Sequence, residues 1–335
     1  MDVGLWELAE LRCEGEAKLR RRLAETDAAL HALVVADEIS EELVTHLVNW
    51  LRLEAALAHA HGFTLGISGG VDSAVTAALV ERATPSSNRY FYLPCQSVDA
   101  DRQAAELVAE ALSLQLETVE LLPLYVAACA ALGAAPAVQP TPLSLMNLKA
   151  MLRMTLLATV ANEHGLLVAG TGNRSEGEHV GFMTKRGDGA ADNAVLGLLF
   201  KRQVCAVARL VGVPEEIVTR PPTPGLRVLP DGTTLTDEAE MGMTYREIEL
   251  ATRLWMEFGA DLATLTAAVC ARYPAKATRV LTVCRKLGLR SWRNRHKLEP
   301  LPWAGLPRRA VPRFEEYPAG FPTVEELLAW KLAGE

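Results

Sequence analysis

A glycine-rich turn between an apolar strand and an apolar helix constrains this chain more than any other feature. Residues 65–75 read Leu-Gly-Ile-Ser-Gly-Gly-Val-Asp-Ser-Ala-Val. Gly69 and Gly70 lack the Cβ atoms that would keep the backbone away from a bulky anion. Ser73 is expected to cap the following helix, so that free N–H groups and the positive helix end meet at one spot. Asp72 beside an anion makes chemical sense when a divalent cation lies between the two. The turn therefore predicts a phosphate site with a metal ion; the alternative is a turn with no ligand.

Strand and helix patterns alternate along most of the chain. The expected strands are 63–67, 89–93, 115–119 and 166–169, and the helices between and after them are 73–83, 101–112, 144–164 and 200–211. This alternation predicts an α/β fold with a doubly wound, mostly parallel sheet that binds ligands at the carboxyl ends of its strands. Further helices are expected over 5–60 and 244–290, loops at 131–142 and 220–237, and a Pro-rich tail at 299–322 before a last short helix.

Composition excludes several classes of function. The net charge of −7 argues against a nucleic-acid groove. The six cysteines are scattered, with no C-x-x-C pair, so neither a zinc nor an iron–sulfur site is expected and the thiols are expected to be reduced. The N-terminus lacks the pattern of a signal peptide, and the sequence shows no uninterrupted apolar run long enough to span a membrane. A cytoplasmic protein is the resulting expectation.

A second polar constellation follows the strand at 166–169. It begins with the small-residue turn Gly170-Thr171-Gly172-Asn173, and Glu176 comes shortly after. If this strand lies beside the first, Asp72 and Glu176 point at one Mg²⁺ whose remaining ligands are phosphate oxygens. Four cations follow at Lys185, Arg186, Lys201 and Arg202. A lysine near the β or γ phosphate would offset charge on departing pyrophosphate, whereas the alternative for these cations is solvated surface charge.

The S-G-G-x-D-S run resembles the pyrophosphate loop of the N-type ATP pyrophosphatases, which cleave ATP between the α and β phosphates; it is not a Walker A loop. The second stretch resembles the signature of one branch of that superfamily, the NAD synthetases. The matching residues are Gly170, Thr171, Glu176, Gly181, Phe182, Thr184, Lys185, Gly187, Asp188, Gly189, Leu199, Lys201, Gln203 and Val204. Asn147, Lys149, Ala150, Arg153, Pro222, Thr223, Thr236, Asp237, Glu238, Gly242 and Tyr245 resemble flanking runs of the same family.

The resemblance implies a role for individual residues. The implied ATP-binding residues are Gly66, Ser68, Gly69, Gly70, Asp72, Ser73, Thr171, Lys201 and Thr223. The implied metal ligands are Asp72, Glu176 and Thr223, and the implied catalytic residues are Asp72, Lys185 and Lys201. The implied binding residues for the acyl substrate, deamido-NAD, are Arg153, Phe182, Lys185, Asp188 and Asp192.

The same resemblance implies the reaction and its partners. The expected reaction amidates deamido-NAD through an acyl adenylate, with ATP as co-substrate, Mg²⁺ as cofactor, and AMP and pyrophosphate as products. About 60 residues precede Ser68, too few for a glutaminase domain, so ammonia is the expected nitrogen donor unless a separate glutaminase subunit supplies it. A homodimer is expected. We expect one domain over 1–335, with helices at 1–60, the ATP pyrophosphatase core at 61–255 and a helical, Pro-rich extension at 256–335.

Five positions depart from the family pattern. Met151 replaces an arginine, Arg186 a tyrosine, Val195 a proline, and Pro224-Gly225 an Ala-Asp pair. These departures bear on the acceptor more than on the adenylation chemistry. Two other readings therefore remain: a related ATP pyrophosphatase that adenylates a different carboxylate or carbonyl acceptor, and a catalytically idle nucleotide-binding subunit.

Overall fold

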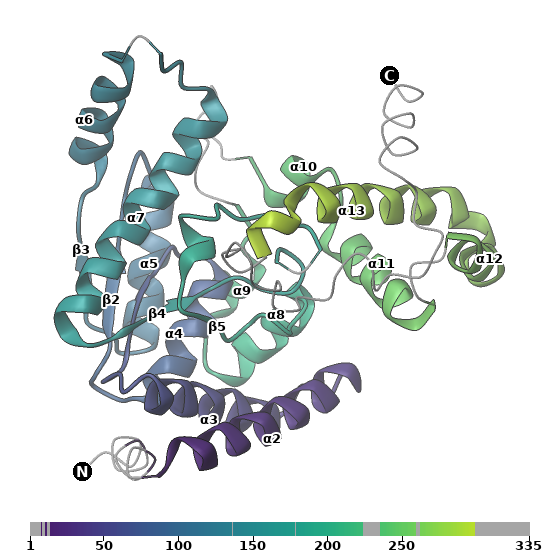
Figure 1. Ribbon diagram of the computed structural model, residues 1–335, viewed down its shortest axis with the longest axis horizontal. Coiled ribbons are helices and arrows are strands. Elements are labelled where there is room, and N and C mark those ends of the chain that lie inside the picture. The colour runs from purple at the N-terminus through teal and green to yellow at the C-terminus, as the bar shows by residue number, and fades with distance from the viewer. Residues whose placement is uncertain are drawn as a thin grey trace, which may run out of the picture. The chain divides into compact units, whose positions relative to one another are not determined.

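The structure is a computed structural model, and it describes residues 8, 11, 14–135, 137–177, 179–223, 235–258 and 262–298 (Figure 1). The chain forms two compact units. The first unit comprises Met1–Arg174 and Met183–Glu240, and the second comprises Ser175–Phe182 and Met241–Glu335. Each unit has its own core of buried apolar side chains.

A five-stranded parallel sheet organises the first unit. Its strands are β1 (Phe63–Gly66), β2 (Arg89–Tyr92), β3 (Leu116–Thr118), β4 (Leu167–Gly170) and β5 (Asn193–Ala194), in the spatial order β3-β2-β1-β4-β5. Thr64 of β1 is in register with Arg89 on one side and Val168 on the other. The strand order reverses direction between β1 and β4, which is where open parallel sheets bind ligands. The predicted α/β class with a doubly wound parallel sheet is confirmed.

Helices cover both faces of this sheet. Successive side chains along each strand point to opposite faces, so each face has its own set of apolar side chains to bury. Tyr90 and Tyr92 belong to one buried cluster, whereas Phe91 and Leu93 belong to another. The first cluster includes side chains of α3 (Glu41–Leu57), α4 (Val71–Ala83), α5 (Asp99–Ala111) and α8 (Lys201–Leu210). The second cluster includes side chains of α6 (Leu122–Gly133) and α7 (Pro142–His164), which runs along the sheet in Figure 1.

The two N-terminal helices, α2 (Glu16–Val35) and α3, pack side by side in an antiparallel pair (Figure 1). The helical pattern expected over 5–60 is interrupted at residues 36–40, because Asp37 adopts a left-handed φ of 62° and Ser40 then caps α3 by accepting from Leu43 N–H. The Asp37 carboxylate accepts hydrogen bonds from Arg202 at 2.8 and 2.9 Å and from Gln203 Nε2 at 2.8 Å. The N-terminal helices are thereby tied to the first turn of α8.

One helix was missing from the expectation, and α7 begins at Pro142 rather than at the expected residue 144. The sequence predicts no helix between 115–119 and the loop at 131–142, yet α6 lies there and the loop begins only after it. The apolar run Leu-Pro-Leu-Tyr-Val-Ala-Ala lacks a clear amphipathic period, which is why the sequence did not indicate this helix. In the structure only Tyr125 of α6 is buried.

Within the described part of the chain, α7 has the length and apolar composition of a membrane span. Its contacts with β1, β4 and α6 make it a helix that covers the sheet, so composition alone is weak evidence for a span.

The second unit is helical. It contains α11 (Tyr245–Phe258), α12 (Leu262–Arg272) and α13 (Ala277–Leu298), in agreement with the expected helices over 244–290. The segment Ser175–Phe182 packs into this unit through Val180, which is buried in its core. Two side chains near the end of α13 hold the segment: Asn294 donates to the Val180 carbonyl at 2.9 Å and Lys297 to the Gly181 carbonyl at 2.8 Å.

The chain also forms the short helices η1 (Asp188–Ala190), α9 (Glu215–Thr219) and α10 (Asp237–Met241), and the single turn η2 (Pro274–Lys276) before α13. Most of the loop expected at 220–237, including Pro224 and Gly225, lies outside the described residues, as do the expected Pro-rich tail and the last short helix.

Candidate active site

The glycine-rich turn leaves the N-terminus of α4 open to a ligand. The helix begins at Val71 with Gly70 at its N-cap, and among the described residues no side chain caps its first turn. The prediction that Ser73 caps the helix is therefore wrong, because the helix starts two residues earlier. The Ser73 hydroxyl instead donates to the Gly70 carbonyl at 2.9 Å and accepts from Ser68 N–H at 3.2 Å. The first-turn N–H groups of an uncapped helix, at its positive end, form an anion site.

Gly69 fixes the shape of the turn for a reason that the sequence did not reveal. Its φ is +79°, in the left-handed region that favours glycine, and a Cβ there would lie 2.6 Å from the Ala104 Cβ of α5. The turn is thus pressed against α5. Arg220 secures the same contact, because it donates to the Gly69 carbonyl at 3.3 Å and to the Asp101 carboxylate at 2.7 Å.

Asp72, Asn173 and Lys201 come together from three parts of the chain. Asp72 lies in the first turn of α4, Asn173 in the loop after β4, and Lys201 at the first residue of α8. The Lys201 ammonium forms an ion pair with Asp72 Oδ2, and Asn173 Nδ2 donates to Asp72 Oδ1 at 2.9 Å. Lys201 is 7% exposed and Asn173 is 1% exposed. The structure therefore brings two of the three predicted catalytic residues, Asp72 and Lys201, into direct contact, and it adds Asn173, which the prediction did not include.

Two predicted residues, Glu176 and Phe182, belong to the second unit. The Tyr245 hydroxyl donates to Glu176 Oε1 at 2.6 Å, and Phe182 N–H donates to the Glu176 carbonyl at 2.8 Å. Phe182 packs against the apolar core of that unit. The joint metal role of Glu176 and Asp72, which lies in the first unit, stays a prediction.

The turn that carries Lys185 and Asp188, two residues predicted to bind the acyl substrate, lies against α7. Thr184 donates its hydroxyl to Asn147 of α7 at 2.9 Å, and Thr184 N–H donates to the Asp188 carboxylate at 2.9 Å. Gly187 lies so close to Ala150 of α7 that a Cβ would approach the Ala150 Cβ to 2.7 Å. The turn that carries Lys185 and Asp188 is thereby seated on the helix.

Arg153 and Asp192 have structural partners. Arg153 donates to the Leu93 carbonyl at 3.0 Å, and burial lowers the pKa of its guanidinium while the charges of Cys95, Tyr92, Asp101 and Asp188 act in the opposite direction. The exposed Asp192 accepts from Val168 N–H at 2.7 Å and so extends the pairing of β4 with β5.

The remaining predicted residues are placed by their elements. Gly66 ends β1, Thr171 directly follows β4, and Thr223 comes before the part of the chain that is not described. Lys185 is partly buried. The structure thus groups Ser68, Gly69, Gly70, Asp72, Ser73 and Lys201 around the start of α4, with Thr171 in the loop after the neighbouring strand.

The donor set suits a magnesium ion that arrives with a nucleotide. Within the described ranges, no group of three or more His, Cys, Asp or Glu side chains is placed to hold a metal ion. Mg²⁺ is usually bound through one or two carboxylates, waters and substrate phosphates rather than by an all-protein cage. Asp72 offers one carboxylate at the edge of an anion site, beside the Lys201 ammonium and the Asn173 amide. The residues present therefore fit this ion.

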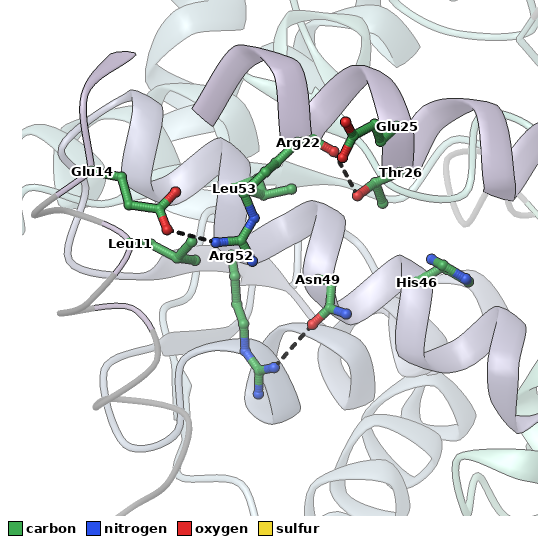
Figure 2. A pocket seen from close by; sticks show the side chains of 9 residues that line it. All are labelled: Leu11, Glu14, Arg22, Glu25, Thr26, His46, Asn49, Arg52 and Leu53. Atoms are coloured by element: carbon green, nitrogen blue, oxygen red, sulfur yellow. Dashed lines mark hydrogen bonds and ion pairs between the residues drawn. The ribbon is translucent and has the colours of Figure 1, made fainter. Parts of the chain in front are cut away.

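A cavity of about 520 Å³ lies elsewhere in the first unit, beside α2 and α3 (Figure 2). Its charged side chains already have partners: Arg22 pairs with Glu14 at 2.9 Å, and Arg52 binds Asn49 and the carbonyls of Arg82 and Ala83. None of the predicted site residues, all of which fall in the described ranges, lines this cavity.

Sequence reasoning missed Asn173 and the pair Arg220–Asp101 as parts of the site. Asn173 carried a usable signal, because a polar side chain in the loop after a strand that neighbours β1 is expected near the turn after β1. Arg220 and Asp101 gave no such signal, since their contact depends on how α5 packs against the turn.

Comparisons with known proteins agree with this geometry. The family model described as NAD synthase matches residues 43–271. The NH(3)-dependent NAD(+) synthetase of Carboxydothermus hydrogenoformans is 43% identical over 209 residues, which cover 62% of this chain and 84% of the relative. The solved structure of NMN synthetase from Francisella tularensis is 30% identical with a TM-score of 0.64, over 79% of this chain and 98% of that one. The NH3-dependent NAD synthetase from Campylobacter jejuni, 22% identical with a TM-score of 0.59 over 78% of this chain and 98% of that one, shows the same fold. The chain belongs to the NAD synthase family.

Proposed function

We propose that this protein is an ammonia-dependent NAD synthetase, a carbon–nitrogen ligase that amidates deamido-NAD with ATP. The observation that carries the proposal is the uncapped start of α4 beside the Asp72–Lys201 ion pair, in a chain of the NAD synthase family. The name NH(3)-dependent NAD(+) synthetase, borne by relatives at 43% and 40% identity, supports ammonia as the nitrogen donor.

The reaction is a two-step amidation. The nicotinate carboxylate attacks the α-phosphorus of ATP, and pyrophosphate leaves with the bonding electron pair. Ammonia then attacks the acyl carbon, and AMP departs from the resulting intermediate, which loses a proton to give the amide. A carboxylate is a poor electrophile, so adenylation supplies the leaving group. The protein's task is to position the reactants and to stabilise charge on the phosphates.

The residues around α4 hold the pyrophosphate. The first-turn amides of α4, with Ser68, Gly69, Gly70 and Ser73, donate to its oxygens. Lys201 starts from its ion pair with Asp72 and turns its ammonium to the phosphates when ATP enters. Bound Mg²⁺ would neutralise phosphate charge, with Asp72 and, as we propose, Glu176 and Thr223 as its protein ligands.

The acceptor is held by a second set of residues. We assign deamido-NAD binding to Arg153, Phe182, Lys185, Asp188 and Asp192, and the nucleotide contact after β4 to Thr171. The contacts of Thr184 and Gly187 with α7 support this assignment for the first-unit members, because they fix the turn that presents Lys185 and Asp188.

A product assay tests this function. Purified protein is incubated with deamido-NAD, ATP, Mg²⁺ and an ammonium salt, and NAD, AMP and pyrophosphate are quantified. The expected result is equal amounts of all three. Formation of ADP and phosphate, or tight ATP binding with no AMP release, would overturn the proposal; the second outcome is that of a catalytically idle nucleotide-binding subunit.

A second acceptor is favoured by one specific observation. The Francisella tularensis structure that matches 79% of this chain is that of an NMN synthetase, a name that places the amide on a mononucleotide. The second candidate is therefore the same adenylation applied to nicotinate mononucleotide. Comparing kcat/KM for the two acceptors decides between them, and a preference for another carboxylate or carbonyl compound would exclude both.

We propose further that the protein is a homodimer. On α6 and the start of α7, large apolar side chains are exposed: Leu124 by 50%, Val126 by 56% and Leu143 by 61%. A second copy of the chain would cover this surface, since such patches rarely stay exposed. Sedimentation of Leu124→Glu/Val126→Glu is expected to give a monomer where the wild type and Ala28→Glu, on exposed α2, give a dimer. A wild-type monomer would exclude the homodimer.

The setting of the enzyme completes the proposal. We propose that both units act as one NAD-synthetase-like domain over 1–335, in the cytoplasm, where ATP and ammonia are available. A separate glutaminase subunit remains the alternative nitrogen source. To test it, turnover with saturating ammonium is compared with turnover in the presence of glutamine and cell extract. Equal rates would exclude a need for such a subunit.

A further inference from the structure

We propose that Asn173 is a positioning residue that holds the Asp72 carboxylate in place for the nucleotide-bound cation. This inference rests on the proposed function for its biological meaning. Its physical basis is the local geometry: Asn173 Nδ2 donates to Asp72 Oδ1 at 2.9 Å, and the asparagine is 1% exposed.

The loop that carries Asn173 is fixed on both sides. It leaves β4, whose register with β1 places the two carboxyl strand ends next to each other. On its other side, Arg174 N–H donates to the Leu199 carbonyl at 2.9 Å, and the Arg174 guanidinium lies 5.1 Å from the centre of the Phe200 ring. The amide of Asn173 is thus held in place by the sheet and by the approach to α8.

Of the two partners that Asp72 has among the described residues, Asn173 is the one that suits a bound cation. A carboxylate has about four acceptor positions, so one amide donor leaves room for a metal ion on the same group. The Lys201 ammonium carries a charge of the same sign as the cation and repels it at close range. Asn173 is neutral and adds no repulsion. It can therefore keep its hydrogen bond when the cation binds, whereas Lys201 exchanges Asp72 for the phosphates.

A metal-binding measurement tests this role without turnover. The full chain is titrated with Mn²⁺ in the presence of α,β-methylene-ATP, which is not cleaved at the relevant bond, and bound Mn²⁺ is followed by electron paramagnetic resonance. The variant is Asn173→Leu, which has a similar shape but no donor. Removing a residue that orients a metal ligand typically weakens metal binding 10- to 100-fold, and we expect a loss in that range.

Asn49→Ala is the matched control, because it removes an asparagine from α3 in the same unit without touching Asp72. We expect it to bind Mn²⁺ like the wild type. Turnover of Asn173→Leu is expected to recover as Mg²⁺ is raised, since a positioning defect weakens cation binding more than it changes the bound state. If Asn173→Leu does not fold, Asn173→Ser provides the same comparison with a smaller polar side chain.

Each outcome has a distinct meaning. A folded Asn173 variant that binds Mn²⁺ as tightly as the wild type overturns the inference, and so does an equal loss in Asn49→Ala. A wild type that binds Mn²⁺ with the nucleotide but makes no NAD refutes the proposed function and leaves the role of Asn173 standing.

Discussion

Lys201 and Asp72, 129 positions apart in the chain, form an ion pair at the start of α4. Both are largely shielded from solvent, with side-chain exposures of 9% and 17%. The lysine thus occupies the carboxylate that the proposed reaction assigns to a cation, and it lies at the edge of the anion site formed by the uncapped helix. Within this pair, the two charges compensate each other.

Replacing Lys201 tests whether this cation acts on the phosphates. Lys201→Met removes a charge aimed at departing pyrophosphate, and the loss of one such group typically lowers kcat by about 10²-fold or more. Lys18→Met on the exposed face of α2 is the control and should turn over like the wild type. Steady-state kinetics with a thermal unfolding curve separates the effects. A folded Lys201→Met enzyme with normal kcat would contradict the role.

Gly69 is expected to tolerate no side chain. Gly69→Ala forces a non-glycine residue into the left-handed region and a Cβ into contact with Ala104, and we expect a loss of about 1–3 kcal/mol in the free energy of unfolding. ATP binding should weaken as well, because the turn changes shape. Gly133→Ala, whose Cβ would meet no atom within 4 Å, is the control. Equal stability of the two variants in urea would show that the strain argument is wrong.

Asp37 is expected to support α8 from outside the family match. Asp37→Ala leaves the fully buried Gln203 without one of its acceptors, and we expect a loss of about 1 kcal/mol, because the Arg202 pair is exposed and contributes little. Asp27→Ala, on exposed α2, should change the unfolding free energy by less than about 0.5 kcal/mol. The KM for ATP should rise in Asp37→Ala alone, since Lys201 lies in the first turn of α8, beside the Arg202 and Gln203 that Asp37 binds. An unchanged KM would limit Asp37 to stability.

The second unit is expected to show an acid-sensitive contact. Hydrogen bonds from Arg279 at 2.6 and 2.9 Å, together with Thr244 N–H, hold the pKa of Glu247 below its usual value of 4.5. A depressed folded-state pKa stabilises the fold above the unfolded value, and this contribution disappears as the pH falls through the folded value. The stability difference between wild type and Glu247→Gln should therefore be constant above pH 4.5 and shrink below it. Arg279→Met should show the same pH dependence as Glu247→Gln. If the difference in unfolding free energy between wild type and variant grows at low pH, the predicted direction is wrong.

The sequence predicted those parts of the fold that local patterns determine. The strand–turn–helix at 63–83 and the apolar strand before Gly170 were recognisable because apolar periodicity and small residues act within a few positions. The helix α6 was not, since its apolar side chains follow no single face. The prediction that Ser73 caps α4 was wrong, because two glycines allow the helix to begin at Val71.

The site was predictable only in its residue types. Asp72 and Lys201 could be named from motifs, but their ion pair depends on α8 packing against α4, which no local pattern encodes. Asn173 depends on the pairing of β1 with β4, and Arg220 on a contact with α5. Long-range packing, rather than composition, decides these contacts.

Isotope transfer from the acceptor to AMP tests the central claim most directly. Deamido-NAD is prepared with oxygen-18 in its nicotinate carboxylate and converted with ATP, Mg²⁺ and an ammonium salt, and the AMP formed is analysed by mass spectrometry. If the carboxylate attacks the α-phosphorus at the open end of α4, each AMP carries one labelled oxygen and the pyrophosphate carries none. Unlabelled AMP, or label in inorganic phosphate, would contradict the account.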